Sequence, residues 1–311
     1  MDAVIAYVNG CEKVWRTEYN KYGTMNNFTL FRFYDWGTLR YVLRGISTYM
    51  PYIKNVFLLV SNIEQVPDYV DQSKVKIVLH KDYIPEEYLP TFNACTVELF
   101  IHNIKELDNE FIFFNDDMIT VSPIAYNDLM YNGLPCLSFT ENHSTFGKSA
   151  YHIIYNSFDA ACLYVGNKNS YSSKIIDNPF EYSGPGVCTV HGPCVFLKHR
   201  NEEIYNSLED LITRTISAIR YPKNTAKYIY SDVLYLENNY IGSRLTLTYI
   251  DSRDLRKNNC KSIFTNINTN YVCINDLGPI CGLTYKESAN LIQESLDIKL
   301  PKPSKYEISN K

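Results

Sequence analysis

Apolar positions in the first 120 residues alternate between short continuous runs and helical spacing. The runs 3–8 (AVIAYV), 55–60 (NVFLLV), 75–79 (VKIVL) and 111–114 (FIFF) predict buried strands. The last is apolar at every position, which is typical of a central strand covered on both faces. Apolar residues recur every three or four positions in 39–50 and 93–104, which predicts helices. Strands that alternate with helices predict an α/β fold with a Rossmann-like, mostly parallel sheet and flanking helices.

The second half of the chain is organised less regularly. Residues 140–186 are rich in Tyr, Ser, Asn, Lys and Gly, which indicates a polar insertion or lid, or alternatively a surface excursion. An amphipathic helix is predicted over 201–219, and a capping box at Thr284–Glu287 predicts a last helix. We expect a single catalytic domain over 1–311, with a frayed tail at 301–311.

Charge and composition narrow the class of protein. The 30 Lys and Arg residues nearly balance 34 Asp and Glu, and this net charge of -4 argues against a nucleic-acid binder. No run approaches the ~18 apolar residues of a membrane span. The chain opens without a signal-peptide pattern, and its nine cysteines favour a reducing cytoplasm. The 44 aromatic residues (27 Tyr, 15 Phe and 2 Trp) suit polar-ligand clefts and interfaces alike.

Three residues that could ligate a metal lie close together near position 190. Cys188, His191 and Cys194 are each separated by two residues. Structural zinc usually takes four ligands, and no CxxC pair completes this set, although His199 lies nearby. Whether the three bind a metal or are ordinary buried side chains stays open.

The strongest local signal is the acidic pair that follows FIFF. Asp116 and Asp117 come directly after this strand, and ligands of α/β sheets bind beyond the carboxyl ends of strands. Adjacent carboxylates in such a place favour a divalent cation, held together with substrate phosphates. Asn275 and Asp276 follow another strand-like run and are candidates for the same cation. Ordinary turns after strands are the alternative for both pairs.

Basic residues and histidines supply further candidates. Arg40 and Arg44 share one face of the predicted helix at 39–50, and with Arg32 they match phosphate oxygens, unless they are only a solvated helix flank. Glu98 and His102 are spaced i, i+4, so the carboxylate would orient the imidazole as a general base. The alternatives are a solvated pair and, for the base, His191.

The order of these motifs resembles the Stealth family of sugar-phosphate transferases. The first matching stretch is 2–10 with Trp15. The second runs from Arg32 to Asp117 and includes LR at 39–40 and 43–44, QVP at 65–67, LPTFN at 89–93 and FIFFNDD at 111–117. The third is HGP at 191–193 followed by Arg214 and Asp232, and the fourth is VCIND at 272–276. The chain departs from the family at Asn9, Thr38 and Gly45, where Asp, Glu and Ser are common.

The resemblance implies an α/β fold of the nucleotide-sugar transferase type, similar to GT-A enzymes. It implies transfer of a hexose-1-phosphate, such as N-acetylhexosamine-1-phosphate, from a UDP-sugar to a glycan hydroxyl in capsule or surface polysaccharide synthesis, with release of UMP. The substrate-binding residues would be Tyr7, Val8, Asn9, Gly10, Arg32, Arg40, Arg44, Asn93 and Arg214. Asp116, Asp117, Asn275 and Asp276 would hold Mg²⁺ or Mn²⁺, with His102 oriented by Glu98, or His191, as the base and Asp116 assisting.

Two other functions stay open on the sequence alone. A metal-dependent glycosyltransferase would use the same acidic pair but release UDP. A non-catalytic sugar-nucleotide or glycan-binding protein would keep the fold and lose the chemistry. For the enzyme we expect a cytoplasmic location. A membrane-attached acceptor would require peripheral docking to the inner face of the membrane, but the sequence contains no basic amphipathic helix that predicts it.

Overall fold

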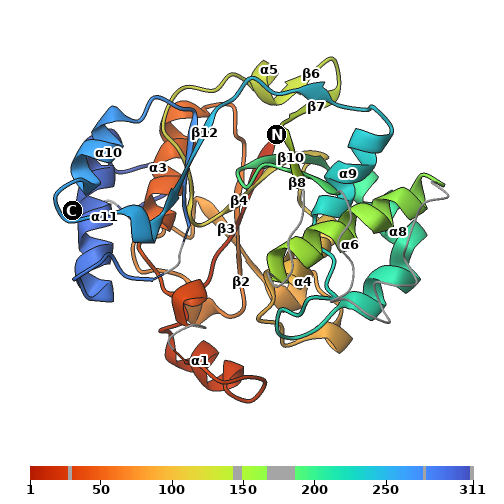
Figure 1. Ribbon diagram of the computed structural model, residues 1–311, viewed down its shortest axis with the longest axis horizontal. Coiled ribbons are helices and arrows are strands. Elements are labelled where there is room, and N and C mark those ends of the chain that lie inside the picture. Colours follow the sequence, from red (N-terminus) through yellow and green to blue (C-terminus); the bar gives the residue numbers. More distant parts are fainter. Residues whose placement is uncertain (27–29, 143–148, 167–185, 276–277, 309–311) are drawn as a thin grey trace.

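The architecture is a five-stranded sheet with helices on both faces (Figure 1). It comes from a computed structural model that describes residues 1–26, 30–142, 149–166, 186–275 and 278–308. The strand order is β10-β4-β1-β2-β3, formed by Cys194–Leu197, Glu110–Asn115, Asp2–Ala6, Val56–Val60 and Val75–Leu79. Strands β4, β1, β2 and β3 are parallel to one another, and β10 is antiparallel to β4. The predicted mostly parallel α/β sheet with flanking helices is therefore confirmed.

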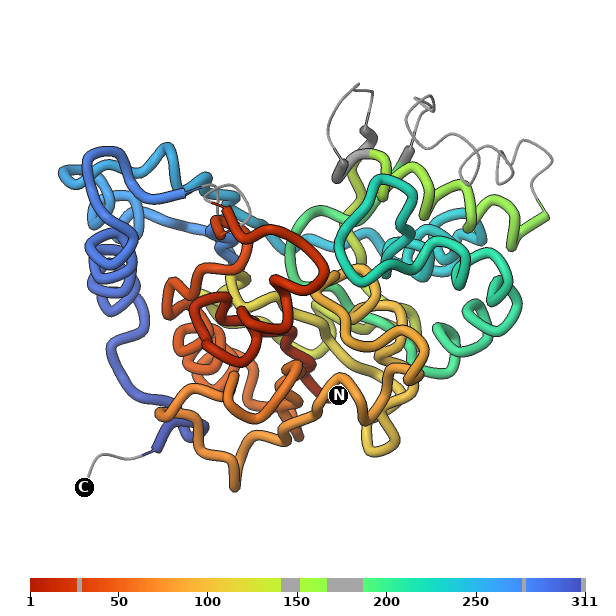
Figure 2. Tube along the Cα trace, turned by 90° about the horizontal axis from the view of Figure 1, so that it is seen from below, coloured from red at the N-terminus to blue at the C-terminus, as the bar shows by residue number. Residues whose placement is uncertain are grey.

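Two hydrophobic cores lie on the two faces of this sheet. Alternate side chains of β1 point to opposite faces, so Ala3 and Ile5 join one core and Val4 joins the other. The first core is covered by α3 (Leu39–Tyr49), α10 (Cys260–Asn266) and α11 (Tyr285–Lys299). The second is covered by α4 (Ala94–Leu99), α6 (Ser149–Tyr164), α8 (Lys198–Thr215) and α9 (Tyr228–Leu236). Figure 2 shows α1 (Lys13–Tyr19) and its flanking loops, in red, between these two groups of helices.

Smaller sheets extend the framework beyond the central one. The sheet β12-β13-β5 joins Leu247–Asp251, Tyr271–Asn275 and Met118–Thr120, and β13 runs antiparallel to β5. The others join β6 (Met130–Tyr131), β7 (Leu134–Leu137) and β11 (Ile241–Gly242), and β8 (Phe139–Asn142) with β9 (Gly186–Thr189). A short helix, α5 (Tyr126–Leu129), precedes β6. Helix α3 packs on β5, where a side chain on Gly45 would collide with the backbone of Thr120.

The insertion predicted at 140–186 contains a core element. Helix α6 packs against α9, and its Ala160 and Ala161 are fully buried in the second core. The described part of the segment is therefore no surface excursion. Residues 143–148 and 167–185 lie outside the described residues, so their role as a lid stays a prediction.

The tail at 301–311, which we expected to be frayed, is anchored as far as residue 308. The Ile308 N–H donates to the Tyr69 carbonyl and the Asp71 N–H to the Tyr306 carbonyl, each at 2.8 Å. Tyr306 and Glu307 are buried. The sequence prediction failed because the tail is polar by composition, while its buried partners lie some 240 residues earlier in the chain. The predicted capping box of α11 is confirmed, since Thr284 and Glu287 exchange hydrogen bonds.

Candidate active site

Asp116 and Asp117 form the turn between β4 and β5, at the carboxyl edge of the central sheet. The preceding side chains from Phe111 to Phe114 are fully buried, and this fixes where the strand ends. Ala6 at the end of β1 pairs with Asn115. The nucleotide-binding stretch predicted at 7–10 and the acidic turn therefore follow neighbouring parallel strands, the usual position of a ligand site in such sheets.

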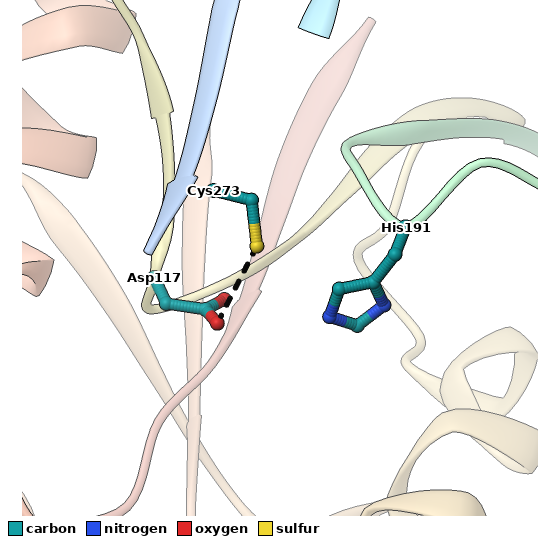
Figure 3. Close-up of side chains that lie close together, drawn as sticks. All are labelled: Asp117, His191 and Cys273. Carbon is teal, nitrogen blue, oxygen red and sulfur yellow. Dashed lines mark hydrogen bonds between the residues drawn. The ribbon is translucent and has the colours of Figure 1, made fainter. Parts of the chain in front are cut away.

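Asp117, His191 and Cys273 come together at this edge (Figure 3). One ligand atom from each lies within 4.8 Å of the others, and this is the one such group of His, Cys, Asp and Glu across the described ranges. Two antiparallel pairings build the group. Strand β13 pairs with β5 so that Cys273 lies opposite Met118, and β10 pairs with β4 so that the loop carrying His191 returns to the end of β4.

The electrostatics of the group suit cation binding and proton acceptance. The Cys273 thiol donates a hydrogen bond to Asp117 Oδ2 at 3.6 Å, while Asp117 Oδ1 is buried and has no hydrogen-bond partner among described residues. Burial raises the pKa of Asp117 to about 6 and holds the pKa of the Cys273 thiol well above its usual value. Desolvation, helped by the charges of Lys227 and Arg220, lowers the pKa of His191 to about 4. At neutral pH the carboxylate is thus ionised and the imidazole neutral.

Glu98 forms a buried ion pair with Lys227 rather than orienting His102. The Lys227 ammonium lies 2.7 Å from the Glu98 carboxylate and 4.7 Å from the centre of the Phe113 ring on β4. Its charge partly offsets the rise that burial causes in the pKa of Asp117, and it contributes to the lowered pKa of His191. Glu98 therefore holds the Lys227 ammonium group beside the candidate site.

The prediction that Glu98 orients His102 is wrong, and the role of His102 as base stays a prediction. Helix α4 ends at Leu99, and residues 101–103 form a separate 3-10 turn, so the i, i+4 geometry of one continuous helix does not exist. His102 is buried beside Tyr205, with ring centroids 5.0 Å apart, and precedes β4, at the strand end opposite the acidic turn. Burial lowers the pKa of this imidazole to about 4.

The residues predicted to hold the nucleotide connect several loops. Tyr7 donates its hydroxyl hydrogen to Asp35 at 2.8 Å, and the Asn9 N–H donates to Gln65 Oε1 at 2.6 Å. The Gly10 N–H donates to the Phe33 carbonyl, and a Cβ on Gly10 would lie 2.5 Å from that of Phe33. Val8 packs against the cluster of Trp15, Tyr19 and Phe92. The stretch is rigidly held beside the acidic turn, and its role in nucleotide binding stays a prediction.

Arg44 and Arg40 bind the C-terminal part of the chain, contrary to the prediction that they bind phosphate. Arg44 is buried; it contacts Glu307 through Nε at 3.0 Å and Asp297 through a terminal nitrogen at 2.9 Å. It also donates to the Leu300 carbonyl at 2.8 Å. Arg40 lies over the Tyr69 ring, with Nε 3.5 Å from Glu307. Partners so far along the chain could not be read from a local spacing.

Asn93 is also a structural residue. It is fully buried and caps α4, accepting from the Cys95 N–H, and its amide donates to the Ser217 carbonyl and to Asn224 at 3.1 and 3.0 Å. These bonds occupy its side chain in this structure, and the predicted substrate contact stays a prediction.

The remaining predicted residues are placed as follows. Arg214 is exposed in the last turn of α8, and Asn275 ends β13 beside Asp251. Asp276 lies outside the described residues. Arg32 is exposed, and its pKa is lowered by burial of part of its side chain and by the neighbouring charge of Arg220.

Sequence reasoning missed three residues near the site. Lys227 and Arg220 lie in an irregular segment without a motif, and Cys273 stands in an apolar run that does not reveal which side chain faces the acidic turn. Of the hypothesised cluster of Cys188, His191 and Cys194, only His191 belongs to the observed group, whose other members are Asp117 and Cys273; Cys188 lies in β9 and Cys194 in β10.

Comparison with known proteins finds one family that matches part of the chain. Residues 32–135 match the family described as Stealth protein CR2, conserved region 2. The resemblance to the Stealth family is confirmed. The Stealth region begins before α3 and ends in β7, so it includes the acidic turn.

Several curated proteins are similar to this chain. Capsular polysaccharide phosphotransferase WcwK of Streptococcus pneumoniae is 26% identical and aligns with 99% of this chain and 98% of its own. Capsular polysaccharide phosphotransferase CpsJ of Streptococcus thermophilus is 35% identical over 44% of this chain and 60% of its own. Receptor polysaccharide phosphotransferase WefC of Streptococcus oralis is 34% identical over 43% of each. The prediction of an enzyme of the phosphotransferase class is confirmed.

Among solved structures, galactosyltransferase LgtC aligns with 97% of this chain and 98% of its own at 8% identity, with a TM-score of 0.40. The fold class therefore rests on the sheet order and pairing. Across the described ranges, no helix has the length and apolar character needed to cross a membrane.

Proposed function

We propose that this protein transfers an N-acetylhexosamine-1-phosphate from a UDP-sugar to a glycan hydroxyl in capsule or surface polysaccharide synthesis, releasing UMP. The names of its relatives support phosphotransfer to a polysaccharide. The observation that carries the proposal is the neutral His191 imidazole beside the unpartnered oxygen of Asp117, at the carboxyl edge of the sheet. This pair supplies a proton acceptor next to a carboxylate that favours a cation.

The reaction we propose is a displacement at the β-phosphorus of the donor. The acceptor oxygen forms a new bond to this phosphorus, and the bond from phosphorus to the bridging oxygen breaks, so that UMP leaves with that oxygen. The acceptor proton passes to a ring nitrogen of His191. The sugar keeps its anomeric bond, so catalysis depends on in-line positioning and on neutralising the phosphate charge.

Mg²⁺ or Mn²⁺ fits the oxygen donors of the acidic turn. Asp117 Oδ1 is buried and lacks a hydrogen-bond partner in the described part of the chain, as expected of a carboxylate oxygen that accepts a cation. Asp116, Asn275 and Asp276 would add oxygen ligands, as we infer from their strand-end positions. When bound, the cation neutralises charge on the leaving phosphate.

We assign the donor phosphates to Arg220 with Arg32, in place of Arg40 and Arg44. Arg220 is half-buried and makes no hydrogen bond or ion pair with any residue that the structure describes, although its charge acts on both His191 and Arg32. A guanidinium without a carboxylate partner near the base is suited to phosphate oxygens. Residues 7–10 would hold the nucleoside. Arg214, exposed on α8, stays the alternative anion ligand.

For the cellular setting we propose the cytoplasm, with peripheral contact to the inner face of the membrane when the growing glycan is membrane-attached. Analysis of nucleotide products is the test of the function. The protein is incubated with Mg²⁺, a glycan acceptor and a panel of UDP-hexoses that includes UDP-N-acetylglucosamine, and the products are identified by mass.

Sugar-phosphate transfer yields UMP and a glycan heavier by one hexose phosphate. Release of UDP would instead identify a metal-dependent glycosyltransferase. UDP-sugar binding without any product would identify a non-catalytic binding protein. Asp117→Asn serves as the inactive control, since it keeps the side-chain volume and removes the charge.

A further inference from the structure

We propose that Asp117, His191 and Cys273 form a three-ligand site for a borderline cation, of which Zn²⁺ is the type case. Its donors differ from the oxygen ligands proposed for Mg²⁺, and Asp117 is the one residue that belongs to both sets. The proposal that these residues bind zinc rests on geometry alone. The further expectation, that bound zinc inhibits sugar-phosphate transfer, rests on the proposed function.

The spacing of the donor atoms supports the site. Cys273 Sγ lies 3.6 Å from Asp117 Oδ2. Zinc bonds of about 2.3 Å to sulfur and 2.1 Å to oxygen, at a tetrahedral angle, place these two atoms about 3.6 Å apart. The carboxylate and thiol thus already stand at the separation that zinc requires.

The imidazole completes the set from the opposite side. A ring nitrogen of His191 lies within 4.8 Å of the other two donor atoms, and Figure 3 shows the ring facing the Asp117–Cys273 pair across a gap. Nitrogen and sulfur on tetrahedral zinc lie about 3.6 Å apart, so the His191 loop would need to move inward by no more than about 1 Å. The Asp117 oxygen not bonded to the thiol has no hydrogen-bond partner among described residues, which leaves it available to a cation.

The chemistry of the donors selects the metal. Thiolate and imidazole are preferred by zinc and similar borderline cations, whereas Mg²⁺ takes oxygen ligands almost exclusively. Three protein ligands leave a fourth position open to water or to substrate oxygen. Binding is balanced by loss of the Cys273 thiol proton to solvent as the sulfur–metal bond forms, and no oxidation or reduction takes place.

Zinc and magnesium compete for the charge of one carboxylate, because each cation takes an oxygen of Asp117. Zinc also takes the lone pair of His191, which is the proton acceptor of the proposed reaction. We therefore expect Zn²⁺ to inhibit transfer in the presence of a large excess of Mg²⁺. Inhibition should be relieved by a chelator that removes zinc.

Cobalt substitution tests the site without any measurement of activity. The full chain is stripped of metal and titrated with Co²⁺, whose absorption reports both tetrahedral geometry and a thiolate ligand. We expect both signals, displaced by an equivalent of Zn²⁺. Cys273→Ser should lose the thiolate absorption and weaken Zn²⁺ binding by at least ~100-fold in competition with a chromophoric chelator. The matched control is Cys281→Ser, which alters an exposed cysteine and should behave as the parent.

Retention of the thiolate absorption in Cys273→Ser would overturn the proposal, as would octahedral cobalt in the parent. His191→Gln provides an independent variant, which should keep the thiolate absorption and lose tetrahedral geometry. Circular dichroism establishes that each variant is folded. A protein with thiolate-bound cobalt but no UMP formation would disprove only the proposed function, and UMP formation without thiolate-bound cobalt would disprove only the zinc site.

Discussion

The Lys227 ammonium and the Glu98 carboxylate lie 2.7 Å apart, and each side chain is 6% exposed. A buried pair of this kind is costly to break because the remaining charge has no solvent and no partner. Glu98 lies on α4, in the second core, and it holds Lys227 where the ammonium charge lowers the pKa of the His191 imidazole.

Removing the carboxylate of this pair should destabilise the protein strongly. We expect Glu98→Ala to lower the free energy of unfolding by about 3–5 kcal/mol, because it leaves Lys227 buried and uncompensated. The double variant Glu98→Gln, Lys227→Met should recover most of the stability, measured by urea denaturation. Equal stability of Glu98→Ala and the parent would contradict a buried pair.

Replacing His191 and replacing His102 should have different effects on kcat. His191→Gln should lower kcat by at least ~100-fold with little change in the donor KM, because it removes the proton acceptor. His102→Gln should leave kcat within about threefold, since this residue is buried beside Tyr205, at the strand end opposite the acidic turn. A large kcat effect in His102→Gln alone would restore the sequence-based assignment.

Arg220 should contribute to donor binding. Its replacement by Met should raise the donor KM by about 10- to 100-fold, because hydrogen bonds to charged groups contribute about 1.5–3 kcal/mol. The matched control is Arg214→Met, on the exposed last turn of α8. If the control raised KM and Arg220→Met did not, the phosphate ligand would be Arg214. Calorimetry with UDP gives the same comparison without turnover.

The anchored tail should matter for stability and not for chemistry. Glu307→Ala removes the carboxylate that Arg44 contacts through Nε and a terminal nitrogen, at 3.0 and 3.2 Å. We expect a loss of about 3 kcal/mol in unfolding free energy, with kcat per folded molecule unchanged. Ile308→Ala, at a side chain that is 54% exposed, should have little effect. A drop in kcat at full stability would instead tie the tail to the site.

The Asp117 carboxyl should lower the free energy of unfolding as the pH rises, the opposite of what a carboxyl with a lowered pKa does. Its pKa of about 6 in the folded protein lies above the ordinary value of 3.8, so the fold favours the protonated form. The stability that protonation provides is therefore complete below pH 4 and is lost as pH rises through 6. We expect Asp117→Asn to be more stable than the metal-free parent by about 2–3 kcal/mol at pH 7–8.

At pH 4 the same comparison should give nearly equal stabilities, because the parent is then protonated too. Denaturant unfolding at the two pH values measures both differences. The affinity for Mg²⁺ should show the opposite trend. It should fall about tenfold for each pH unit below 6, because only the ionised carboxylate binds the metal. A pH-independent difference between Asp117→Asn and the parent would rule out the raised pKa.

Sequence patterns predicted the central sheet well because strands buried on both faces leave an unmistakable apolar run. The same run predicted where Asp116 and Asp117 would lie, since the end of a strand is a local property. The Glu98–His102 pair failed because it assumed a continuous helix, which the chain ends at Leu99. Arg44 failed because its partners, Asp297 and Glu307, lie some 250 residues away and give no local signal.

The three members of the candidate site are contributed by segments far apart in the chain. Asp117 and Cys273 are separated by 156 residues, and they meet only when β13 pairs with β5. During synthesis, 156 residues must therefore be added after the acidic turn before the thiol that will contact it is present. Catalytic competence should be acquired only once β13 has left the ribosome and paired with β5.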